Sequence, residues 1–138
     1  LLRDAYKKIA AQVDVVIIEG AGGWLVPLNE TQTMADVAVA LDLPVINVVG
    51  LRLGCLNHAL LTAQAIRAAG LSLAGWVANC IDPDCARQDE IVAALCQRLV
   101  VPLLADQHYL PKDVQPELQA GAIDVEPLLS VRSPDSTV

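Results

Sequence analysis

Hydrophobic and polar positions follow two different periods along this chain. Four short apolar runs have the length of buried strands, at residues 15–19, 45–49, 73–78 and 101–104. Between them, apolar residues recur every three or four positions, as in helices, at residues 1–11, 34–41, 56–69 and 86–99. Strands that alternate with helices predict right-handed crossovers, and therefore an α/β fold whose parallel sheet carries helices on both faces.

Residues at the ends of the predicted helices support these boundaries. Thr33 precedes the helix at 34–41, and Asp36 stands three positions after Thr33. This pair resembles a capping box with Asp in place of Glu. Gly70 stands where helices commonly end in a glycine. The first helix has no capping residue before Leu1, so we expect that a preceding segment is missing from this sequence.

The length of 138 residues fits one domain, which we place at residues 1–120. Beyond Tyr109, prolines and polar residues predict a short helix and then a flexible carboxyl-terminal tail at residues 121–138.

Composition excludes several classes of partner. No apolar run approaches the roughly 20 residues of a membrane span, and a net charge of -7 argues against nucleic acid. The cysteines form no CxxC pair and lack histidines at ligand spacing, which favours a reduced cytoplasmic protein; they are Cys55, Cys80, Cys85 and Cys96.

Polar and glycine residues follow the predicted strands, where open α/β sheets bind ligands. Glu19 begins a glycine-rich turn, residues 50–58 follow the second strand, Asn79 follows the third, and residues 106–110 follow the fourth. A carboxylate can bind magnesium, glycines let backbone N–H groups approach phosphates, and an asparagine amide can pair with adenine. Together they predict a nucleotide site, although the local pattern alone favours Glu19 as an ordinary charged turn residue.

Three longer motifs carry a resemblance to a known family. EGAGGW at residues 19–24, VGLRLGCLNH at 49–58 and AGWVAN at 74–79 closely resemble the ATP-dependent dethiobiotin synthetases, and the likeness extends over roughly residues 13–110. The resemblance implies a P-loop NTPase-like three-layer sandwich and a cytoplasmic homodimer. It also implies that ATP and Mg²⁺ are used to join CO2 to the two amines of 7,8-diaminopelargonate, through a carbamate and a carbamic-phosphoric anhydride, in biotin biosynthesis.

The resemblance also implies roles for particular residues. Glu19 is the family's second magnesium ligand, and the first is expected upstream. The ATP-binding residues are Glu19, Gly20, Ala21, Gly22, Asn79, Cys80, His108, Tyr109 and Leu110, with His108 replacing the family's usual proline. The substrate-binding residues are Gly22, Gly54, Cys55 and Asn57, of which the last three reach across the dimer to the substrate carboxylate.

Simpler roles stay open for the residues of that dimer loop. Asn57 fits an ordinary helix cap, Cys55 a small buried residue, and His58 a polar residue at a helix end.

One family feature is absent from these residues. The phosphate loop GxxxxGK[ST] and the lysine that follows it are missing, so the catalytic lysine is expected upstream and no catalytic residue is predicted here. We therefore expect the carboxyl-terminal portion of a dethiobiotin synthetase, without the N-terminal strand, inactive alone and with an unpaired strand edge. A non-catalytic dimerisation or nucleotide-binding module is the alternative. A third possibility is a cobyrinate-type amidotransferase synthetase or a partition ATPase, and the loop at residues 54–58 argues against it.

Overall fold

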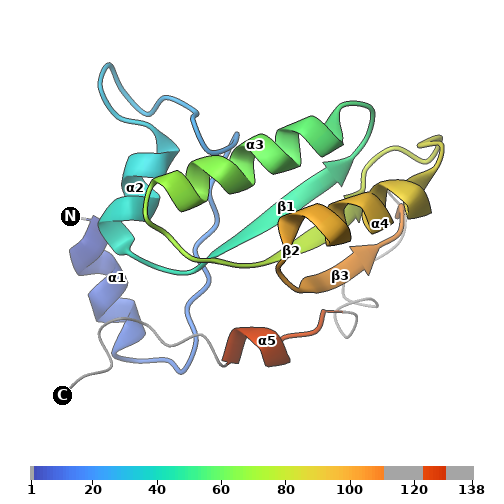
Figure 1. The fold of residues 1–138 in the computed structure, drawn as a ribbon. Helices are drawn as coiled ribbons and strands as arrows, with labels where there is room; N and C mark the ends of the chain where they lie inside the picture. Colours follow the sequence, from blue (N-terminus) through green and yellow to red (C-terminus); the bar gives the residue numbers. More distant parts are fainter. Residues whose placement is uncertain (1, 111–122, 130–138) are drawn as a thin grey trace. The chain divides into compact units, whose positions relative to one another are not determined.

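The computed structural model describes residues 2–110 and 123–129, and the fold is drawn in Figure 1. The chain divides into two compact units, Leu1–Leu43 and Pro44–Val138. Within the described residues, no helix is both long and apolar enough to cross a membrane.

The first unit holds two helices joined by an irregular segment. They are α1 (Leu2–Ala10) and α2 (Met34–Leu41), close to the predicted ranges. The capping box before α2 is confirmed, because the Thr33 N–H and hydroxyl donate to Asp36 Oδ2 at 2.6 Å and 2.9 Å. These hydrogen bonds lower the pKa of Asp36 below its ordinary value of 3.8, the backbone bond contributing most.

The strand predicted at residues 15–19 is wrong. This segment is extended but belongs to no sheet, and Ile17 is 87% exposed. A strand needs a neighbour that pairs with its backbone, and within the described residues the sheet contains only three other strands. The apolar pattern alone therefore does not make this segment a strand here.

The second unit contains the sheet. Its strands are β1 (Val45–Leu51), β2 (Leu73–Cys80) and β3 (Leu103–Gln107), which are parallel and ordered β1-β2-β3. The crossovers are α3 (Cys55–Ala68) and α4 (Gln88–Leu99), which contact each other. The predicted parallel α/β arrangement is thus confirmed in this unit.

Several strand boundaries differ from the sequence prediction, since β1 ends at Leu51 instead of residue 49 and β3 ends at Gln107 instead of residue 104. β2 continues through Asn79 and Cys80 instead of ending at residue 78. β3 begins at Leu103 rather than residue 101, because Val100 ends α4 in the left-handed conformation, with φ 55°, and the chain turns before pairing. The predicted glycine end of α3 is confirmed, since Gly70 has φ 82° and its N–H donates to Arg67 O at 3.0 Å.

The hydrophobic core of the described residues lies where α3 and α4 cover the sheet. Trp76, at its centre, is completely buried. Register pairs Asn47 with Trp76, and Val49 with Ala78, so these side chains share the covered face. Small side chains at Ala59 and Ala63 let α3 approach this face closely.

In the second described range, a short helix α5 (Glu126–Leu129) contacts β2, on the opposite side of the sheet from α3 and α4 in Figure 1. The Asp124 N–H donates to Leu104 O at 2.7 Å. Most of the tail predicted at residues 121–138 lies outside the described residues, so the boundary at residue 120 stays a prediction.

Candidate functional site at the carboxyl edge of the sheet

The ends of the three strands lie side by side. Register pairs Gly50 with Asn79, and Asn79 with Gln107. Asn79 is therefore central, between the loop that follows β1 and the segment that begins at His108. The structure therefore brings Asn79 and Cys80, the predicted residues of β2, close to the end of β3, which leads directly into the predicted strip at residues 108–110.

The loop after β2 is organised around one carbonyl group. Cys80 Sγ donates to Asp82 O at 3.3 Å, and the Cys85 N–H donates to the same oxygen at 3.1 Å. Cys80 is buried whereas Asn79 is half-buried. This arrangement leaves the Asn79 amide available at the edge while the Cys80 thiol stabilises the turn.

Burial raises the pKa of the Cys85 thiol, and the neighbouring Cys80, Cys55 and Asp82 raise it further. Three thiols thus gather at this corner of the sheet. All of them are free, and the thiol of Cys85 is held in its protonated form.

The predicted substrate loop leads into α3 through a tight turn. Gly54 precedes the helix with φ 90°, in the left-handed region that glycine tolerates best. No side chain caps this helix, so Asn57 is not the ordinary cap considered above. Asn57 is exposed in the first turn, where backbone N–H groups can bind an anion.

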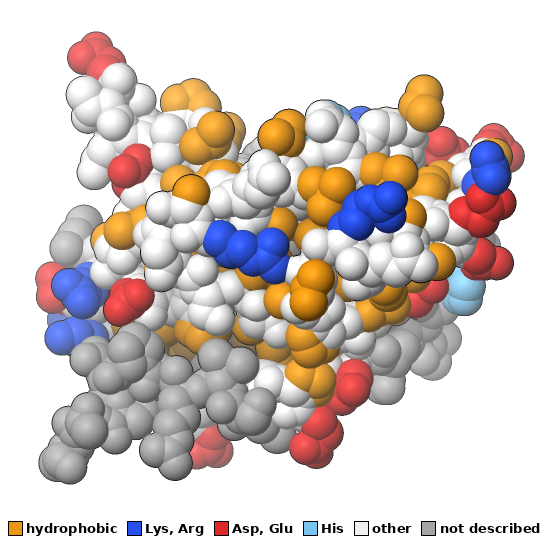
Figure 2. Space-filling view, in the orientation of Figure 1, with side chains coloured by type: hydrophobic (Ala, Val, Ile, Leu, Met, Phe, Trp, Pro, Cys, Tyr) orange, Lys and Arg blue, Asp and Glu red, His pale blue; other side chains and the backbone are white. Residues whose placement is uncertain are grey.

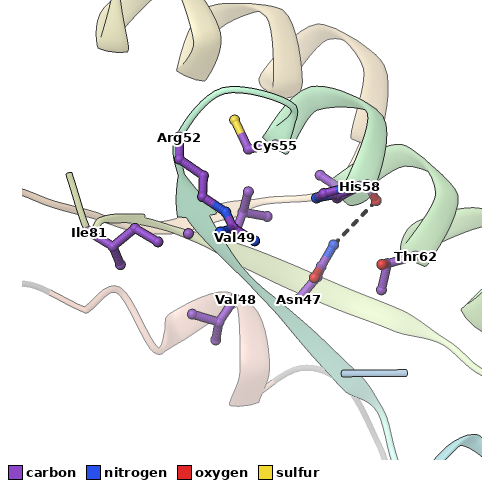
Figure 3. A pocket seen from close by; sticks show the side chains of 10 residues that line it. Asn47, Val48, Val49, Arg52, Cys55, His58, Thr62 and Ile81 are labelled. Carbon is purple, nitrogen blue, oxygen red and sulfur yellow. Dashed lines mark hydrogen bonds between the residues drawn. The ribbon is translucent and has the colours of Figure 1, made fainter. Parts of the chain in front are cut away.

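A hollow of about 190 Å³ lies between β1 and α3 (Figure 3). Of the residues predicted to bind ATP or substrate individually, Cys55 lines it, and Gly50, Arg52 and His58 of the predicted stretch 50–58 line it as well. The lining residues are Asn47, Val48, Val49, Gly50, Arg52, Cys55, His58, Ala59, Thr62 and Ile81.

Asn47 and Thr62 give this hollow polar groups that no sequence motif identified, and Arg52 adds one from the motif at residues 49–58. Asn47 is 9% exposed, and its Nδ2 donates to Ala59 O at 3.4 Å. The sequence did carry one signal, because Asn47 interrupts the apolar run at residues 45–49 and an amide in a core strand needs a polar partner.

The predicted phosphate-binding residues lie in the first unit. Glu19 is exposed at the end of the extended segment. A Cβ on Gly20 would lie 3.1 Å from Met34 Cε, and one on Gly22, which has φ 80°, 3.0 Å from Val26 Cγ2. Both glycines are thus required by the packing of their own loop, whatever they bind.

Backbone carbonyl groups of that loop also accept hydrogen bonds from the N–H groups at the start of α2. The Met34 N–H donates to Val26 O at 3.0 Å, and the Ala35 N–H donates to Trp24 O at 2.9 Å. These donors are occupied, so the start of α2 is not an anion site like the one available at α3.

Residues 2–110 and 123–129 contain no group of three His, Cys, Asp or Glu side chains that could hold a metal ion. Glu19 fits magnesium only as a single carboxylate ligand, which is how this ion is often bound beside nucleotide phosphates and water. On the face drawn in Figure 2, the basic side chains near the middle lie among neutral and hydrophobic ones, whereas those at the margins lie close to acidic ones.

Comparison with known proteins defines the class. The sequence profile described as AAA domain matches residues 1–117, so the chain belongs to the AAA domain family. This assignment agrees with a P-loop NTPase-like α/β fold, here represented by three parallel strands and their helices.

Curated relatives narrow the comparison further. The chain is 48% identical to the ATP-dependent dethiobiotin synthetase BioD of Xylella fastidiosa (strain 9a5c), over 88% of this chain and 54% of the relative. It is 56% identical to the protein of the same name from Aromatoleum aromaticum, over 75% of this chain and 46% of the relative. It is 50% identical to the protein of the same name from Nitrosospira multiformis, over 89% of this chain and 56% of the relative. The chain spans about half the length of the curated relatives it matches.

Proposed function

We propose that this chain supplies part of the active site of an ATP-dependent dethiobiotin synthetase. The observation that carries the proposal is the row formed by Gly50, Asn79 and Gln107 at the carboxyl edge of the sheet, because it sets a base-reading amide beside the substrate loop. The names and identities of the relatives support the same reaction.

In this proposal, the predicted ATP-binding residues of each unit keep the roles that the resemblance implies. The Asn79 amide reads the adenine as donor and acceptor, beside Cys80 and the strip of His108, Tyr109 and Leu110. The turn from Gly20 through Ala21 to Gly22 approaches the phosphates with backbone N–H groups. Glu19 is one ligand of Mg²⁺, which supplies charge neutralisation at the phosphates.

The second substrate is 7,8-diaminopelargonate, which reacts with CO2. Gly54, Cys55 and Asn57 bind its carboxylate at the first turn of α3, which partial positive charge favours and no side chain caps. In a cytoplasmic homodimer, the loop of one subunit would serve the site of the other. The residues named here would place the substrates and neutralise charge on them.

The direct test compares nucleotide binding by Asn79→Ala and by the unchanged chain. We expect ATP affinity to fall about tenfold, close to 1.4 kcal/mol, while affinity for inorganic tripolyphosphate stays the same. Calorimetry measures both ligands, and Gln97→Ala, at an exposed amide side chain of α4, is the control.

Equal losses for both ligands would show that Asn79 does not read the base. A stable dimer whose melting temperature ignores ATP would instead favour a non-catalytic dimerisation module.

A further inference from the structure

The loop after β2 brings two cysteines to one backbone oxygen. Cys80, the last residue of β2, donates its thiol hydrogen to Asp82 O at 3.3 Å, and the Cys85 N–H donates to the same oxygen at 3.1 Å. The Cys80 sulfur and the Cys85 backbone nitrogen therefore lie within two hydrogen-bond lengths of each other. A further hydrogen bond, from the Asp84 N–H to Asp82 Oδ1 at 3.0 Å, keeps the turn closed. The turn thus holds the two cysteines near each other without a covalent bond.

The two thiols differ in how freely they can move. Cys80 is buried, and its backbone pairs with Leu51 of β1. Cys85 is half-buried and lies outside every helix and strand, and its sulfur is 4.0 Å from Ala86 O, a long contact that rotation of the side chain can break. Only residues 81–84 separate the two cysteines, so joining them costs little chain entropy. Cys85 is therefore the thiol that can turn toward a fixed Cys80.

The other two cysteines are poorer partners for Cys85. Charge on Cys80 raises the pKa of Cys85 more than charge on Cys55 does, as expected for the nearer thiol. Cys55 is buried as the first residue of α3, so the helix fixes its backbone. Cys96 is exposed in α4 and is not among the groups that shift the pKa of Cys85. The arrangement thus favours one pair, Cys80 with Cys85.

We propose that Cys80 and Cys85 form an oxidation site, at which a small disulfide such as oxidised glutathione converts the two thiols into an intramolecular disulfide. The Cys85 thiol loses its proton and attacks one glutathione sulfur, so the S–S bond of glutathione breaks and the first glutathione leaves as a thiolate that takes up a proton. The Cys80 thiol then loses its proton and attacks the Cys85 sulfur, which releases the second glutathione in the same way. Two protein thiols are oxidised, and one glutathione disulfide is reduced to two thiols.

The disulfide changes the end of β2. Oxidised Cys80 has no S–H to donate, so Asp82 O loses one of its two donors, and the turn shifts to bring Cys85 within bonding distance. Asn79, which directly precedes Cys80, lies at the carboxyl edge of the sheet. We expect the oxidised form to bind ATP more weakly, a consequence that rests on the proposed function, in which the Asn79 amide reads the adenine.

The experiment equilibrates the chain with mixtures of reduced and oxidised glutathione. Free thiols are then alkylated under denaturing conditions, and the chain is digested with trypsin. Cleavage after arginine divides the cysteines among the peptides 53–67, 68–87 and 88–98, the second of which holds both Cys80 and Cys85. As oxidised glutathione increases, we expect the peptide 68–87 to lose the mass of two hydrogen atoms and to resist alkylation, and dithiothreitol to reverse both changes.

Two variants and one binding measurement complete the test. Cys85→Ser keeps the backbone N–H that binds Asp82 O but cannot form the disulfide, so Cys80 should stay open to alkylation. Cys96→Ser, at an exposed thiol of α4, is the matched control and should oxidise like the unchanged chain. Calorimetry should show ATP affinity falling at least fivefold on oxidation in the unchanged chain and in Cys96→Ser, but not in Cys85→Ser, while affinity for inorganic tripolyphosphate stays the same.

Several outcomes would overturn the proposal. These are a glutathione that stays attached to the peptide 68–87, a link between this peptide and 53–67, and no change in the peptide 68–87 at any ratio of the two forms of glutathione. An internal disulfide with unchanged ATP affinity contradicts the link to nucleotide binding if Asn79→Ala weakens ATP binding in the reduced chain. If Asn79→Ala has no effect there, the proposed function fails, and the peptide masses still decide whether the oxidation site exists.

Discussion

Residues 15–19 and β1 have nearly the same kind of sequence but different structures. Both are short β-branched runs that lead into glycine-containing turns. β1 pairs with β2 along its whole length and buries Val49 and Leu51 beneath α3, whereas Ile17 is exposed and its segment joins no sheet. The difference shows that such a run becomes a strand through the partner that pairs with it, more than through its own composition.

The contrast extends to the two units. The described residues that are buried lie in the second unit, from Asn47 onward, while neither α1 nor α2 buries a residue. Local hydrogen bonds organise the first unit, such as those of the Thr33 capping box and of Asn29 Oδ1 with the Thr31 and Gln32 N–H groups. A core stabilises the second unit, so substitutions should have different consequences in the two.

The largest expected effect concerns Glu19, which ends the unpaired run. In an active enzyme assembled from this chain and the unmatched portion of a relative, we expect Glu19→Gln to lower magnesium-dependent turnover at least a hundredfold, because a neutral amide is a poor ligand of Mg²⁺. Steady-state kinetics across magnesium concentrations measure the effect. Glu30→Gln, at another exposed position of the first unit, should leave turnover unchanged. An unchanged rate in Glu19→Gln would remove this residue from the site.

The next prediction applies one substitution to both runs. Val49→Ala should lower the free energy of unfolding by about 2 kcal/mol, because it leaves a cavity under α3. Val15→Ala, at a side chain that is 65% exposed, should change it by less than about 0.5 kcal/mol. Urea denaturation monitored through the buried Trp76 measures both variants. Equal losses would mean that residues 15–19 are packed in solution as β1 is.

Much of this fold could be predicted from sequence, because its signals are local. The period of apolar residues placed α3, α4, β1 and β2 within two residues at most boundaries, and Thr33 and Gly70 were correctly identified as helix ends. The strand at residues 15–19 was wrong because strand pairing depends on a distant neighbour. The start of β3 moved because Val100 adopts a left-handed conformation that its sequence does not favour.

The candidate site was only partly predictable. Residues at the carboxyl ends of strands can be found from sequence, since a parallel sheet brings these ends together, and Asn79 is such a residue. The hollow depends instead on how α3 crosses β1, so Thr62 gave no signal, and Arg52 was found only as part of the motif at residues 49–58. The predicted roles of the individual site residues stay predictions.

A smaller effect is expected at the capping box of the first unit. The hydrogen bonds from Thr33 depress the pKa of Asp36, so ionised Asp36 stabilises α2 at pH values above 3.8, and this stabilisation is lost as the pH falls through the lowered pKa. Asp36→Asn should therefore increase amide exchange in α2 at neutral pH and make little difference in strong acid. Asp42→Asn, at the other end of α2, is the control. An effect of Asp36→Asn that persists unchanged in acid would contradict the role of the charge.

The smallest expected effect lies in the second unit, at the loop after β2. Because burial and the neighbouring Cys80 raise the pKa of Cys85 above its ordinary value of 9.0, this thiol should react with iodoacetamide more slowly at neutral pH than the exposed Cys96. The ratio of the two rates, measured by mass spectrometry of peptides, should narrow as the pH rises through the raised pKa. Asp82→Asn separates the effect of charge from that of access. It removes a negative charge near Cys85, so it should modestly increase the reaction rate of Cys85 without changing that of Cys96. If the ratio is the same at every pH, limited access rather than the pKa controls the reaction, and the contrast between the two thiols is one of packing alone.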